Sequence, residues 1–196
     1  MKIMKEWILV VVGFFILASG CKSTEQAVWD NMAGTYTIPS LKIVYVVPTE
    51  VENWAVADLG HAIPEIKFCG VDNSAVICVL ILEPGLVKSV KEMNAAKVWK
   101  LLYEMICQSS TGCVLQFNPD IGQEKYRNLD SWKFRTDVLI ANGCDTVGVT
   151  YAGYFFDSPN GKMAGIVSIA PTSHLDAVGI QILDKYFDGV RFFAEE

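Results

Sequence analysis

The sequence has few of the residues that carry catalysis or metal binding. Only two histidines occur, His61 and His174. Neither a Cys-x-x-Cys nor a His-x-x-x-His spacing is present, so the short motifs that hold zinc are missing. Glycine-rich phosphate loops and the Gly-x-Ser-x-Gly nucleophile motif are missing as well. We therefore predict no metal site, no cofactor and no catalytic residues, and an enzyme is the less favoured class.

Positive charge is scarce and scattered. The chain has 16 lysines and arginines against 22 aspartates and glutamates, which gives a net charge of −6. Nucleic acids and anionic lipid surfaces are bound by clustered basic side chains, and no such cluster occurs. This excludes a nucleic-acid partner. At 52% hydrophobic residues, the chain has ample material for a folded core.

The most informative stretch is the N-terminus. Lys2 and Lys5 form a short basic head, and an uncharged apolar run follows at residues 7–17. A membrane-spanning helix needs about 20 apolar residues, which this run does not supply. Its length is typical of the hydrophobic region of a secretory signal. We predict a signal peptide over residues 1–20.

The end of this segment resembles the lipobox of bacterial lipoproteins. It reads Ala18-Ser19-Gly20-Cys21. The resemblance implies cleavage before Cys21, lipid on its sulfur and attachment to the membrane of the bacterial cell envelope, on the periplasmic face or the cell surface. Two or three acyl chains anchor a protein stably where one does not. The alternative is an ordinary signal anchor in which Cys21 is incidental.

Beyond the signal, we expect a lipidated tether at residues 21–33 and a single domain at 34–196. Five cysteines remain, an odd number, so at least one thiol stays unpaired within the chain. Several lie in apolar runs, where cysteine behaves as a small hydrophobe. Cys69 with Cys78, across a hairpin, and Cys107 with Cys113 are the candidate disulfide pairs. Cys144 is the remaining thiol.

Apolar patterns predict an α+β domain. Strands are expected at 35–47 (interrupted by Pro39), 66–71, 75–82, 113–117, 131–141, 146–156, 162–170 and 190–193. Capping-box spacings at Ser89 and Ser173 start two amphipathic helices. The expected fold is a mostly antiparallel sheet covered by these two helices, an α/β sandwich.

Residues 118–130 are predicted to form a polar loop. Four carboxylates lie in and around it: Asp120, Glu124, Asp130 and Asp137. They could help to bind a cation, although their spacing does not follow an EF-hand loop. A solvated loop is the favoured interpretation.

The C-terminal half resembles the PsbP/DcrB-like group. The features are a long aromatic hairpin ending at 166–171, a capped helix, and the segment 186–192, Tyr-Phe-Asp-Gly-Val-Arg-Phe. The resemblance implies an α/β sandwich with a binding or accessory role, and the group has no shared catalytic residues to transfer.

Three functions remain open. The favoured one is a lipid-anchored, non-enzymatic envelope protein that binds a protein partner, through an exposed aromatic patch that includes Trp54, Tyr126 or Trp132. The second is an immunity lipoprotein that neutralises a toxin. The third is a thiol-dependent hydrolase, which needs Cys144 beside His174 or His61, and nothing in the sequence places them together.

Overall fold

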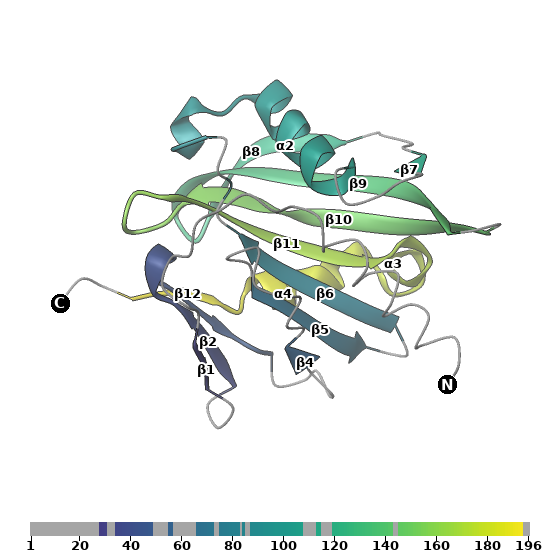
Figure 1. Ribbon diagram of the computed structural model, residues 1–196, viewed down its shortest axis with the longest axis horizontal. Helices are drawn as coiled ribbons and strands as arrows, with labels where there is room; N and C mark the ends of the chain where they lie inside the picture. Colours follow the sequence, from purple (N-terminus) through teal and green to yellow (C-terminus); the bar gives the residue numbers. More distant parts are fainter. Residues whose placement is uncertain are drawn as a thin grey trace.

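The computed structural model describes residues 28–30, 34–48, 55–56, 66–72, 75–82, 84, 87–107, 113–114, 119–142 and 145–193. Within this part of the chain, two antiparallel sheets account for most of the structure (Figure 1). The predictions for Cys21, Trp54, His61 and Cys144 lie outside the described residues.

The larger sheet has eight strands among the described residues. Its order is β4-β5-β6-β11-β10-β9-β7, and β8 pairs with β9 beside β7. The strands are β4 (Ala55–Val56), β5 (Ile66–Asp72), β6 (Ala75–Leu82), β7 (Cys113–Val114), β8 (Asp120–Tyr126), β9 (Leu129–Asn142), β10 (Asp145–Asp157) and β11 (Met163–Pro171). The predicted hairpins β5–β6 and β10–β11 are confirmed. As its apolar run indicates, β6 lies inside the sheet, between β5 and β11.

The smaller sheet has four described strands in the order β1-β2-β3-β12. They are β1 (Val28–Asp30), β2 (Thr35–Ile38), β3 (Ile43–Val46) and β12 (Val190–Phe192). The predicted interruption at Pro39 is the 3-10 turn η1 (Pro39–Leu41) between β2 and β3. Because β1 pairs with β2, residues 28–30 of the predicted tether belong to the folded domain.

The first helix begins later than its sequence pattern predicts. Ser89 caps a 3-10 turn, η2 (Val90–Glu92), through a hydrogen bond from the Lys91 amide. The helix α2 (Ala95–Cys107) follows, and the side chain of Asn94 accepts from the Lys97 amide at 2.9 Å. The capping-box prediction at Ser89 is therefore wrong for the helix itself, because Asn94 supplies its cap.

The predicted final helix is divided into three pieces. They are α3 (Thr172–Val178), the 3-10 turn η3 (Ile180–Leu183) and α4 (Asp184–Phe187). Gly179 breaks the helix with φ of 90°. Pro171 occupies the N-cap of α3, and no described side chain caps it, so the capping box predicted at Ser173 is wrong.

The polar loop predicted at 118–130 is also wrong. Residues 120–126 form β8, which pairs with β9 along its whole length. The two-residue turn between them, Arg127-Asn128, has positive φ at both positions, 50° and 68°. This is the backbone expected of a type I′ hairpin.

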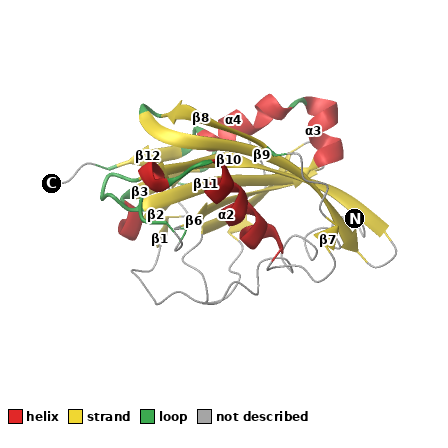
Figure 2. Ribbon diagram, turned by 90° about the horizontal axis from the view of Figure 1, so that it is seen from above, coloured by secondary structure: helices red, strands yellow, loops and turns green. Residues whose placement is uncertain are grey.

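The layers form the predicted α+β sandwich, with one addition. On one face of the large sheet, α2 packs on the cluster that contains Phe134, Phe155 and Val167. On the other face, the small sheet and the α3–α4 segment together enclose a second cluster around Tyr45, Phe156 and Tyr186. Figures 1 and 2 show α2 and the α3–α4 segment on opposite sides of the strands. The small sheet is the layer that sequence patterns did not predict.

Among the described residues, no helix combines the length and apolar character needed to cross a membrane.

Candidate functional site

A groove of about 440 Å³ lies between the large sheet and the C-terminal helical segment. Strands β8, β9 and β10 line one side, and η3 and α4 line the other. We call it the C-terminal groove. Its lining residues are Asp120, Gly122, Gln123, Glu124, Lys133, Phe134, Arg135, Ala152, Gly153, Tyr154, Ile180, Gln181, Leu183, Asp184 and Phe187. This volume is within the range of about 300–1,000 Å³ that ligand sites occupy.

The strand register shows which charged side chains face the groove. Gly122 pairs with Lys133, and Lys133 pairs with Tyr154. Directly opposite residues on neighbouring strands point to the same face of a sheet. Lys133 and Arg135 are two residues apart on β9, so both cations point to the groove face.

The cations on the floor are held by neighbouring carboxylates. Lys133 Nζ lies 3.0 Å from Glu124 Oε2, and Arg135 Nη2 lies 3.7 Å from Asp137 Oδ2. The hydrogen bond to Glu124 raises the pKa of Lys133 above its usual value, so its ammonium is charged at neutral pH. Both pairs are substantially exposed, and their net contribution to stability is small.

Aromatic rings stiffen the floor. The ring of Tyr154 is stacked on Tyr126 at 4.6 Å and meets the edge of Phe187 at 5.4 Å. Lys133 Nζ lies 5.7 Å from the centre of the same Tyr154 ring. Burial raises the pKa of Tyr154, so its hydroxyl stays neutral. The arrangement joins a rigid aromatic surface to charges of both signs, which suits binding of a polar ligand.

A second hollow of about 530 Å³ lies on the opposite face, between η2 and the β8–β9 hairpin. Trp132, Lys91 and Met93 are among its lining residues. Trp132 is half-buried against the α2 cluster. This places the predicted binding residue Trp132 on the α2 side of the sheet.

The structure does not bring Tyr126 and Trp132 into one patch. Tyr126 is only 6% exposed and belongs to the other core cluster, on the groove side of the sheet. Its hydroxyl donates to the carbonyl oxygen of Phe187 at 2.6 Å. Tyr126 therefore supports the groove from below and is not part of an exposed surface.

The four carboxylates considered for a cation site occupy a strand and its neighbour. Three of them face a cation: the ion pairs are Glu124–Lys133 at 3.0 Å, Asp130–Lys125 at 2.6 Å and Asp137–Arg135 at 3.7 Å. The hydrogen bond from Lys125 lowers the pKa of Asp130 below its usual value. Among the described residues, no three acidic, histidine or cysteine side chains are grouped to hold a metal ion.

Two of the thiol predictions can be followed along the backbone. Cys69 and Cys78 are direct register partners on β5 and β6, so the hairpin that would join them exists. Their disulfide stays a prediction. His174 lies on α3, and its Nε2 is buried without a hydrogen-bond partner among the described residues. The pairing of His174 with Cys144 stays untested.

The residues of the C-terminal groove were missed by sequence reasoning, except for Asp120 and Glu124. The remaining charged lining residues come from β9 and α4, and only the strand register and the position of α4 bring them together. One sequence signal was available. Tyr126 is followed by Arg127-Asn128, and an apolar-polar alternation begins at Trp132, which together are compatible with a hairpin.

Neither the protein-family models nor the curated proteins give a match to this sequence. Among solved structures, the crystal structure of LpqN, involved in cell envelope biogenesis of Mycobacterium tuberculosis, is similar to this chain. The TM-score is 0.45 at 11% sequence identity, over 78% of this chain and 83% of that chain. A likeness this distant carries no inference about function.

Proposed function

We propose that this protein is a lipid-anchored binding module of the bacterial cell envelope. The observation that carries the proposal is the N-terminal segment, in which a basic head and an apolar run lead to Ala18-Ser19-Gly20-Cys21. Lipid on Cys21 would hold the domain at the membrane surface, since two or three acyl chains together anchor stably.

The C-terminal groove supports a binding role for the domain. It combines cations, carboxylates and a rigid aromatic floor on one face of the sheet, and these groups can orient a polar ligand. A partner in the envelope, most simply another protein, would meet this face while the lipid keeps the domain nearby.

The experiment that tests the anchor is metabolic labelling with an alkyne analogue of palmitate in a bacterium that processes lipoproteins. The full chain should incorporate the label and be found in the membrane pellet. Cys21→Ser should lose the label, because the acceptor sulfur is gone. Cys144→Ser is the matched control and should be labelled like the parent. A Cys21→Ser variant that keeps its label would refute the lipid anchor.

A further inference from the structure

The C-terminal groove exists because small residues occupy positions where larger ones would fill it. Ala152 stands on β10 beside Arg135, and Gly122 stands on β8 beside Lys133. A Cβ atom built at Gly122 meets nothing within 4 Å. The space beside Gly122 is therefore open to a Cβ atom, and a side chain introduced there would extend into the groove.

Two of the carboxylates that line the C-terminal groove have no cation of the described chain beside them in an ion pair. Lys133 and Arg135 are neutralised by Glu124 and Asp137, as described above. Asp120 on β8 and Asp184 on α4 both line the groove, and neither forms an ion pair with any described residue. One unpaired carboxylate thus stands on the strand side of the groove and one on the helical side.

The floor between these carboxylates is suited to a cation. The face of an aromatic ring attracts ammonium and guanidinium groups within about 6 Å of its centre. The Tyr154 ring is one such face, and the Lys133 ammonium, 5.7 Å from its centre, is already paired with Glu124. Gln181 on η3 adds an amide group at the helical side.

The groove also extends along β8. Asp120, Gly122 and Glu124 of this strand line it. Among the described strands, β8 pairs with β9 alone. An extended partner could lie along this edge, where main-chain hydrogen bonds hold it and alternate side chains select it.

We infer that the C-terminal groove receives a lysine or arginine side chain of a partner polypeptide, between Asp120 and Asp184. This rests on the proposed binding function and names the chemistry of the partner. The net charge of −6 also favours approach of a basic partner.

The test measures binding of a fluorescein-labelled hexapeptide of alternating lysine and serine to the full chain in neutral detergent micelles, by fluorescence anisotropy. A second probe has glutamate in place of lysine. The lysine probe should bind and the glutamate probe should not. Asp120→Asn and Asp184→Asn should each weaken the lysine probe by about fivefold, the effect of losing one exposed charge pair.

Two further variants separate the groove from general attraction between opposite charges. Asp176→Asn removes the same charge from an exposed residue of α3 that does not line the groove, and affinity should stay within about twofold. Gly122→Leu changes no charge but fills the groove, and should weaken binding by about tenfold or more.

Three results would overturn the inference: equal weakening by Asp176→Asn, unchanged binding by Gly122→Leu, or tighter binding of the glutamate probe. None of these bears on palmitate labelling at Cys21, so failure of the groove and failure of the anchor are distinguishable.

Discussion

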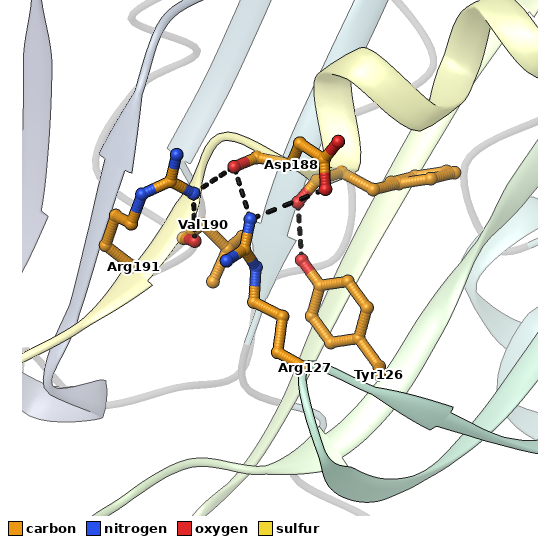
Figure 3. A network of polar contacts seen from close by, with 6 residues as sticks. Tyr126, Arg127, Asp188, Val190 and Arg191 are labelled. Carbon is orange, nitrogen blue, oxygen red and sulfur yellow. Dashed lines mark hydrogen bonds and ion pairs between the residues drawn. The ribbon is translucent and has the colours of Figure 1, made fainter.

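The hydroxyl of Tyr126 donates a hydrogen bond of 2.6 Å to the carbonyl oxygen of Phe187, 61 residues further along the chain. Beside it, the Arg127 guanidinium donates to the carbonyl oxygen of Asp188 and lies 3.5 Å from the Asp188 carboxylate. Figure 3 shows these contacts converging on the turn that follows α4, together with Arg191. The end of the β8–β9 hairpin is thereby tied to the segment that forms one side of the C-terminal groove.

Tyr126→Phe should lower the free energy of unfolding by about 1–3 kcal/mol, because the buried Phe187 carbonyl loses its donor while ring packing is kept. Urea unfolding followed by circular dichroism measures this. Tyr103→Phe is the control: Tyr103 is 48% exposed, and its variant should stay within about 0.5 kcal/mol of the parent. A Tyr126→Phe variant as stable as the parent would show that this hydrogen bond does not hold the two segments together.

Stability should fall in alkaline solution. Burial is the main cause that raises the pKa of Tyr45, Tyr126 and Tyr154 above 10.0. The unfolded chain releases these protons near pH 10 while the folded chain retains them, so the folded state is stable below pH 10 and loses stability above it. Lys133, with its raised pKa, acts in the same direction above 10.5.

The measurement is the free energy of unfolding in urea at intervals between about pH 8 and about pH 11. It should be level up to about pH 10 and then decline, with a shallower decline in Tyr126→Phe. A free energy that stays level or rises above pH 10 would contradict the burial of these hydroxyls.

Local patterns were sufficient to predict elements that pack into the core. The four-residue spacing of Val98, Leu102 and Ile106 predicted α2, and these three side chains are fully buried. The strand β6 was predicted from a continuous apolar run, which is typical of a strand buried on both faces. In both cases burial in the core requires apolar residues at particular positions, so the pattern is visible in the sequence.

The sequence did not predict β8, because few of its residues are buried in the core. Most of β8 is exposed, and its sequence, Asp-Ile-Gly-Gln-Glu-Lys-Tyr, lacks a buried alternation. Its turn uses Arg127-Asn128 without glycine, although both residues have positive φ. The usual Asn-Gly or Asp-Gly signal of a type I′ turn was therefore missing. A polar composition is typical of a loop, so residues 118–130 were predicted as one.

The small sheet and the groove depend on contacts between distant segments. β12 pairs with β3 across almost the whole length of the domain. Asp184 lines the groove with Asp120, Lys133 and Tyr154, which precede it by 64, 51 and 30 residues. No local pattern encodes such pairings, because each segment alone is compatible with several partners. Only the strand register of the structure shows which of these distant segments are neighbours.

The two capping-box spacings should behave differently. The Asp157 carboxylate accepts from Ser89 Oγ and from the Val90 amide, both at 2.7 Å, so Ser89 joins η2 to the end of β10. Ser89→Ala should lower the free energy of unfolding by about 0.5–2 kcal/mol. Ser173 is exposed and caps no helix in the described structure, so Ser173→Ala should change it by less than about 0.5 kcal/mol. Urea unfolding measures the free energy of unfolding of both variants. Equal losses in the two variants would refute the contact of Ser89 with Asp157.

The break in the C-terminal helix should depend on glycine at position 179. Gly179 has φ of 90° and ψ of 142°, a region that residues with a side chain rarely occupy, and an added Cβ would lie 2.6 Å from Gln181 Oε1. Gly179→Ala should therefore lower the free energy of unfolding by about 1–3 kcal/mol. Gly122→Ala is the matched control, because its Cβ has open space and a strand glycine gains order from a side chain. If both alanine variants are equally stable, α3 and η3 do not need this backbone conformation, and the helical side of the groove is held by its packing alone.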